Sequence, residues 1–161
     1  MMPDMIEDGV DAFIARFSAQ AASVEVASRV EGSPLLECLT DDAVLYLLER
    51  TGPYAVSRGP ARVVVQPETA TLVRLDPGDP GPLRHVESLG VGVLVATGVV
   101  RSLEPPFVVV DAGMPLVVAA DVVPDGLAVG DRVRFQSRAP VHGFVLPQER
   151  DRASVQTDDL V

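Results

Sequence analysis

The feature that most constrains this chain is a pair of valine runs that lack polar alternation. Residues 108–110 are all valine, and so are residues 117–118. A strand with one face in water alternates apolar and polar side chains, whereas a strand covered on both faces does not. We therefore expect these strands to be buried on both sides. The sequence offers two sources of cover for the outer face, an amphipathic N-terminal segment and a partner subunit.

Most of the chain after residue 53 is predicted to form short strands separated by turns. Proline and glycine clusters punctuate it at spacings of about ten residues, a pattern typical of barrels and sandwiches. The longest cluster, residues 76–82, is predicted to be an exposed loop. The expected strands cover residues 62–66, 69–75, 91–100, 107–110, 116–120, 132–137 and 141–146.

One of these segments resembles a known architecture. Gly130 and Asp131 come directly before the alternating residues 132–135, and glycine permits a tight entry into a strand. With the strands that precede it, this segment is similar to an oligonucleotide-binding-type (OB-like) or related barrel, over roughly the last 60 residues. The resemblance implies an architecture and no activity.

The N-terminal region is predicted to contain two helices. Ile6, Val10, Phe13 and Phe17 recur at helical spacing and should form one buried stripe. Residues 40–50 are predicted to form a second, short helix, because carboxylates follow its start and glycine and proline follow its end. The fold class expected from the sequence is therefore α+β, mostly β, with a small antiparallel barrel and two N-terminal helices.

These patterns divide the chain into three parts. Residues 1–53 are expected to be a helical segment that packs on the barrel, and residues 54–147 the β core. Residues 148–161 have no apolar stripe and are expected to be a mobile polar tail.

Composition excludes several classes of protein. The chain has 23 acidic and 13 basic residues, a net charge of -10, which opposes binding to nucleic acid or to an anionic membrane. No run approaches the ~18 apolar residues of a membrane span, and the N-terminus lacks the pattern of a secretory signal. Cys38 is the single cysteine, so the chain cannot form an internal disulfide or a thiolate cluster. We expect a cytoplasmic protein without metal or cofactor.

Three arginines form the first candidate site. In an alternating strand, Arg132, Arg134 and Arg138 would share one face, away from Val133 and Phe135. Such a ridge could bind a phosphate, a nucleic-acid backbone or an acidic partner. A purely structural role, in which these arginines form ion pairs with neighbouring carboxylates, is favoured. Nucleic acid is further disfavoured because the region offers few aromatic side chains for base stacking.

His142 is the second candidate. It lies at the start of a predicted strand and could act as a general base if a carboxylate lay within reach. The sequence offers Glu104, Asp111, Asp121 and Asp131 near strand ends. No spacing of a triad or a metal site supports this hypothesis, so an ordinary polar role at the end of a strand is favoured.

No catalytic arrangement stands out, whereas apolar helices and strands offer surface that could be shared. The function expected from the sequence is a non-enzymatic interaction module, or a subunit of a homo- or hetero-oligomer, with a protein partner or a second copy. One alternative is an enzyme or small-ligand protein with a site at the barrel mouth near His142. The other is nucleic-acid binding by the arginines.

Overall fold

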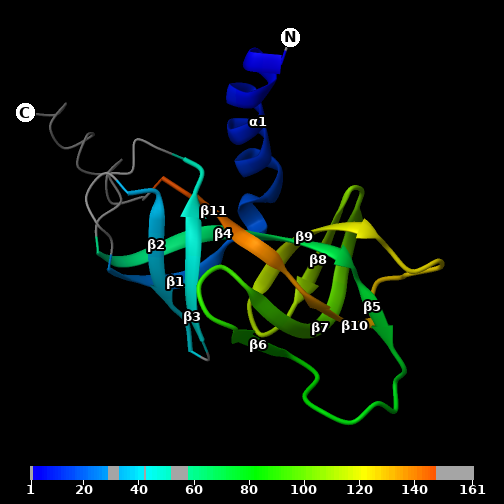
Figure 1. Ribbon diagram of the computed structural model, residues 1–161. Coiled ribbons are helices and arrows are strands. Elements are labelled where there is room, and N and C mark those ends of the chain that lie inside the picture. Colours follow the sequence, from blue (N-terminus) through cyan, green and yellow to red (C-terminus); the bar gives the residue numbers. More distant parts are fainter. Residues whose placement is uncertain (1, 29–32, 42, 52–57, 148–161) are drawn as a thin grey trace, which may run out of the picture.

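The computed structural model describes residues 2–28, 33–41, 43–51 and 58–147, with the backbone alone for residues 2–8. In this part of the chain one α-helix and one 3-10 turn precede eleven strands (Figure 1). The elements are α1 Met2–Phe17, η1 Ser18–Gln20, β1 Ala22–Ser28, β2 Leu35–Leu39, β3 Val44–Glu49, β4 Gly59–Thr71, β5 Val73–Leu75, β6 His85–Ser88, β7 Leu94–Glu104, β8 Phe107–Asp111, β9 Pro115–Val122, β10 Arg132–Gln136 and β11 Arg138–Val145.

The prediction of a second helix over residues 40–50 is wrong. The segment instead contains β3, which is antiparallel to β2 and parallel to β11. Leu45, Leu47 and Glu49 are buried in alternation along it, as in a strand. Thr40, which resembled a helix start, closes the turn before β3, since its Oγ1 donates to the carbonyl of Ala43 at 3.1 Å and accepts from its N–H at 3.0 Å. Hydroxyl side chains stabilise turns as well as helix starts, and pairing on both edges outweighs helix propensity.

The predicted barrel is also wrong, and with it the α+β class with two helices. The strands follow one path, β1-β2-β3-β11-β4-β9-β8-β7-β10-β5, with β6 beside β7. An added pairing of β1 with β4 closes a ring of five strands, three of which come from the region expected to be helical. The remaining strands follow the path from β4 through β9, β8, β7 and β10 to β5, and no second closing pairing of this kind occurs among the described residues. The fold is mostly β, with one helix in the described part of the chain.

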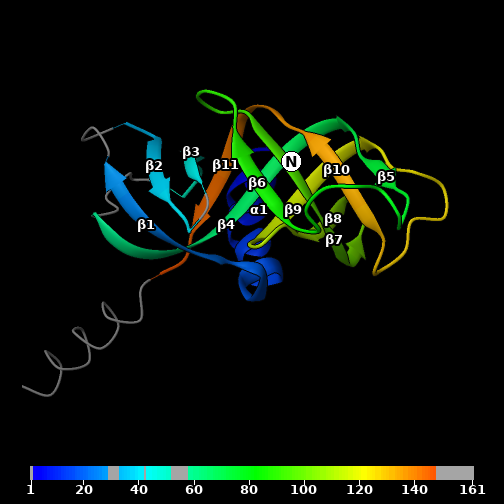
Figure 2. The ribbon, with the colours of Figure 1, turned by 90° about the horizontal axis from the view of Figure 1, so that it is seen from below.

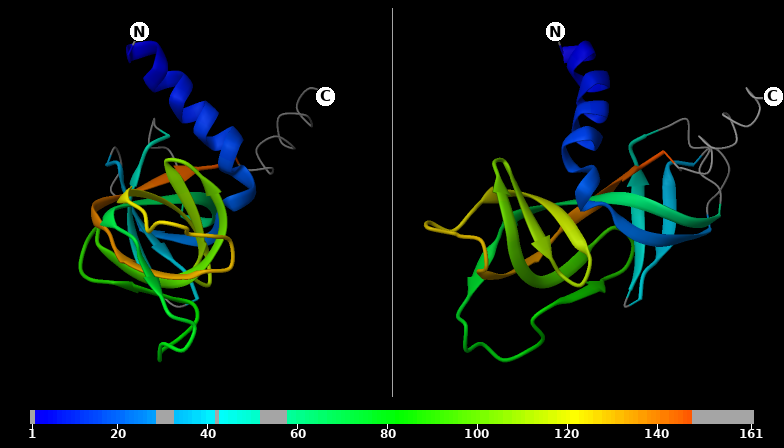
Figure 3. Two further views of the ribbon diagram at one scale, coloured as in Figure 1. Left: turned by 90° about the vertical axis from the view of Figure 1, so that its right-hand side faces the viewer. Right: turned by 180° about the vertical axis from the view of Figure 1, so that it is seen from behind.

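The long strand β4 joins the two curled halves seen in Figure 1 and Figure 3. The sequence predicted separate strands over residues 62–66 and 69–75, on either side of Pro67, yet β4 continues through this proline. Before this proline, β4 pairs with β1 and β11, and after it Glu68 and Thr69 pair in parallel with β9. The register of β11 shifts opposite this point. Proline is tolerated in a sheet at such irregularities because no ladder hydrogen bond is required there.

The valine strands are buried on both faces, as expected. Val108, Val110 and Val118 belong to the large inner core, while Val109 and Val117 belong to a smaller cluster on the outer face. The C-terminal half of α1 supplies the outer cover. The helix-docking patch consists of five outer-face side chains, Val64, Phe107, Val109, Val117 and Phe144. Phe13 and Phe17 of α1 pack against it.

The aromatic rings fix α1 on this patch. Phe17 is fully buried, and the centroid of Phe13 lies 4.4 Å from that of Phe144 and 5.3 Å from that of Phe107. Arg16 stacks over the ring of Phe107 at 5.7 Å and donates a hydrogen bond of 3.1 Å to the carbonyl of Glu104. From here the helix rises away from the strands (Figure 3). The predicted burial of Ile6 falls outside the described side chains.

We expect Phe13→Ala to lower the free energy of unfolding by about 2 kcal/mol, measured by urea denaturation. The value is below the ~3–5 kcal/mol of a fully buried phenylalanine because Phe13 is half-buried. Val129→Ala, at an exposed loop position, is the control and should change stability by less than ~0.5 kcal/mol. Equal stability of the two variants would show that α1 does not depend on this ring.

Candidate functional site

The three arginines lie on two strands. Arg132 and Arg134 are on β10, where Val133 and Phe135 are buried between them as the alternation predicts. Arg138 begins the next strand, β11, because Ser137 turns inward and exchanges hydrogen bonds with Leu94 at 2.7 and 2.8 Å. The three guanidinium groups therefore do not lie along one strand.

The guanidinium of Arg132 is hydrogen-bonded to the loop of residues 76–82. Its guanidinium donates to the carbonyls of Asp79 at 3.0 Å, Asp76 at 3.4 Å and Pro82 at 3.4 Å. The Arg134 side chain is exposed, and its guanidinium has no hydrogen bond or ion pair among the described residues. Arg132 thus restrains a loop of the same chain, whereas Arg134 does not.

Arg138 forms a two-pronged pair with Asp121. Its NH1 and NH2 lie 2.9 and 3.2 Å from the carboxylate oxygens of Asp121, and its Nε lies 3.9 Å from Glu68. The hydrogen bond from Arg138 and its positive charge hold the pKa of Asp121 below its usual range. Both side chains are largely exposed, so the pair adds little stability.

His142 lies on the outer face of β11, beside Gln66 of β4, and is 9% exposed. Arg50 NH1 lies 3.2 Å from its Nδ1. Because an arginine can only donate, Nδ1 is the acceptor, and the neutral ring carries its proton on Nε2. The Nε2 atom lies 3.9 Å from Oε2 of Glu68. Burial, assisted by the Arg50 cation, lowers the pKa of His142 below 6.5, while Glu68 opposes the shift.

The carboxylates expected to converge on His142 face arginines instead. Asp121 pairs with Arg138, as described above. The other three pairs are Glu104 with Arg16 at 3.6 Å, Asp111 with Arg84 at 2.9 Å, and Asp131 with Arg74 at 3.2 Å. Although burial raises the pKa of Asp111, hydrogen bonds from Arg84 and from the N–H of Gly113 outweigh it and lower that pKa. The residues that do approach His142 are Glu68 of β4 and Arg50, which directly follows β3. They were missed because the sequence did not reveal how these strands pair.

Two buried side chains, Cys38 and Glu49, carry an ionisable group. Burial, the largest cause, and the charges of Glu37 and Glu49 raise the pKa of Cys38 to about 12, so its thiol stays protonated at neutral pH. A protonated thiol is a poor nucleophile and a poor metal ligand. Glu49 ends β3 at 2% exposure and accepts a hydrogen bond of 3.0 Å from Thr51 Oγ1. No sequence motif marks this buried carboxylate.

Within the described ranges, no group of three or more His, Cys, Asp or Glu side chains is placed to hold a metal ion. No helix in that part of the chain is long and apolar enough to cross a bilayer. Comparison of the chain with protein-family models, with curated proteins and with solved structures found no match.

We expect stability to depend on pH through His142. Its folded pKa is lower than its unfolded value, so the unfolded chain binds the proton first as the pH falls. The free energy of unfolding should therefore be highest above about pH 6.5 and should decrease as the pH falls through the unfolded pKa. Urea unfolding at pH 7.5 and pH 5.5 measures this decrease, and His142→Gln should reduce it.

His85→Gln is the matched control, since it makes the same substitution at an exposed histidine. A pH dependence that survives in His142→Gln but disappears in His85→Gln would contradict the assignment.

We expect Arg132→Ala to free the loop of residues 76–82 while Arg134→Ala leaves it unchanged. Arg132 alone of the two donates to the loop carbonyls. Amide hydrogen exchange should become about tenfold faster within the loop in Arg132→Ala, as expected when the hydrogen bonds that restrain a segment are lost. Equal exchange in both variants would show that the loop is held by its own turns.

Proposed function

We propose that this protein is a non-enzymatic interaction module that binds its partner through the apolar stripe of α1. The observation that carries the proposal is the position of that helix. Only its C-terminal half lies on the sheet, and Val10, Phe13 and Ile14 stay half-buried although they belong to the same stripe as the buried Phe17. Figure 3 shows the helix standing away from the strands.

Half-covered apolar side chains on a projecting helix support a role in association. Soluble proteins bury such surface in an interface, and a projecting helix gives a partner access to both flanks of the stripe. The opposite side of α1 carries the exposed Asp11, Ala12 and Ala15, so the helix has one apolar face to offer. The remaining surface carries the net negative charge that keeps the protein soluble.

A second copy of the chain is the partner we propose. Two-fold homodimers are the commonest assemblies, and a two-fold contact would cover the same stripe in both copies at once. A heterologous protein partner is the alternative occupant of the same stripe. The aromatic anchor, Phe13 against Phe144 and Phe107, would hold the helix in a fixed direction for either partner.

The two other functions have weaker support. A general base needs a free ring nitrogen, but Nδ1 of His142 already accepts from Arg50. A nucleic-acid surface needs free cations and stacking rings, but Arg132 and Arg138 are bonded within the chain and Phe135 is buried.

We expect Val10→Glu to weaken self-association by roughly tenfold or more, because it places a charge in the apolar contact. Sedimentation equilibrium over a range of protein concentrations measures the effect. Ala12→Glu is the matched control, since it adds the same charge to the exposed side of the same helix.

A wild-type protein that stays monomeric at every concentration would overturn the homodimer. Equal weakening by Val10→Glu and Ala12→Glu would show that the contact lies elsewhere. Both variants should keep the wild-type circular dichroism spectrum, because Val10 is only half-buried at the edge of the outer-face cluster and Ala12 is exposed.

A further inference from the structure

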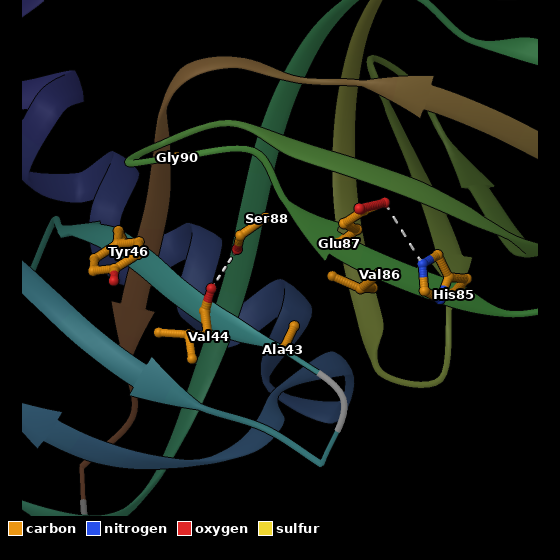
Figure 4. Close-up of a pocket in the computed structure, with 8 residues that line it drawn as sticks. All are labelled: Ala43, Val44, Tyr46, His85, Val86, Glu87, Ser88 and Gly90. Atoms are coloured by element: carbon orange, nitrogen blue, oxygen red, sulfur yellow. Dashed lines mark hydrogen bonds and ion pairs between the residues drawn. The ribbon is translucent and has the colours of Figure 1, made fainter.

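A cleft of about 480 Å³ lies between two strands that are distant in the sequence, β3 and β6. Val44 and Tyr46 line it from β3, and Val86 and Ser88 line it from β6 (Figure 4). Figure 2, viewed from below, shows β6 in front with α1 behind it, so the cleft lies on the other side of the molecule from the helix. The cleft is therefore independent of the surface proposed above.

The edge of β6 that borders the cleft carries unpaired backbone groups. In the described part of the chain, β6 pairs with β7 alone. Leu94 of β7 uses both its N–H and its C=O on Ser137, so the pair of Ser88 with Leu94 is of the non-hydrogen-bonded type. In an antiparallel ladder the two types alternate, so the N–H and C=O of Val86 and Ser88 point away from β7. They point toward the cleft.

The facing edge of β3 is open as well over its first half. The hydrogen bond of 2.9 Å from Thr40 N–H to Ala43 C=O sets the alternation with β2. By that alternation, Val44 and Tyr46 direct their N–H groups away from β2. The other neighbour, β11, pairs with β3 only from Leu47 onward. The cleft thus lies between two strand edges with unused donors.

One contact closes the cleft at a single end. Ser88 Oγ donates to the carbonyl of Val44, as Figure 4 shows. The part of β6 toward His85 has no hydrogen bond to β3 among the described residues. A free strand edge of this kind pairs readily with another extended chain unless charge, proline or cover protects it.

We propose that this cleft binds an extended peptide segment, which adds as a strand to the open edge of β6 at Val86. Backbone hydrogen bonds would supply the affinity, and alternate side chains would supply the specificity. Val44, Tyr46 and Val86 favour apolar side chains on the inward positions. Glu87 at the exposed rim and the net charge of -10 favour basic side chains on the outward positions. The partner is therefore a peptide of alternating apolar and basic residues.

The test uses a capped hexapeptide of alternating valine and arginine as the probe, with binding measured by NMR titration of the full chain. The amides of Val44, Val86 and Ser88 should shift on binding. Val86→Pro removes the outward N–H without removing a bond of the β6–β7 ladder, and it should weaken binding roughly tenfold relative to Val86→Ala. Val86→Ala is the matched control because it loses the same buried side chain and keeps the N–H.

A second measurement does not depend on any variant folding. The same hexapeptide with all backbone nitrogens methylated should bind the wild-type chain at least tenfold more weakly, because it has no backbone N–H left to donate along either edge. Equal binding of the two peptides, equal binding by Val86→Pro and Val86→Ala, or no shift at the three amides would overturn the proposal. Concentration-dependent shifts of these amides without peptide would also overturn it, by showing that a second copy occupies the edge.

Discussion

Burial of the valine strands on both faces is the constraint on which the rest of the structure depends. A strand without polar alternation has no face that tolerates water, so the sheet must curl over one side and find cover for the other. Curling places Val108, Val110 and Val118 in the inner core. The outer side of the same strands, with Val109 and Val117, then requires α1 and its aromatic rings. The position of the helix follows from the strands.

This constraint also explains why β4 is long and why the predicted barrel is absent. A strand of 13 residues can line both curled halves, and Pro67 marks the place where it changes partners. The closed ring then needs β1, β2 and β3, which come from the N-terminal region. The later strands continue the path from β4 to β5, and β6 lies beside β7 with its other edge unpaired among the described residues.

The charged side chains belong to a surface that is largely paired within the chain. Arg132 holds a loop, Arg138 pairs with Asp121, and Arg50 occupies one nitrogen of His142. These contacts hold segments in place and leave little reactive chemistry on the described surface. The features that remain open are apolar or backbone in character: the stripe of α1 and the edge of β6. The two proposals of association rest on these features.

Local periodicity and turn residues predict the first helix, most strands from residue 62 onward, the exposed loop of residues 76–82 and the two-sided burial of the valines. Residues 44–49 form a strand because their pairing with β2 and β11 outweighs their helix propensity, and this pairing is a tertiary property that local patterns do not reveal. The surroundings of His142 were likewise beyond the sequence. Arg50 and Glu68 lie 92 and 74 positions away along the chain, and only the register of β3, β4 and β11 brings them to the ring.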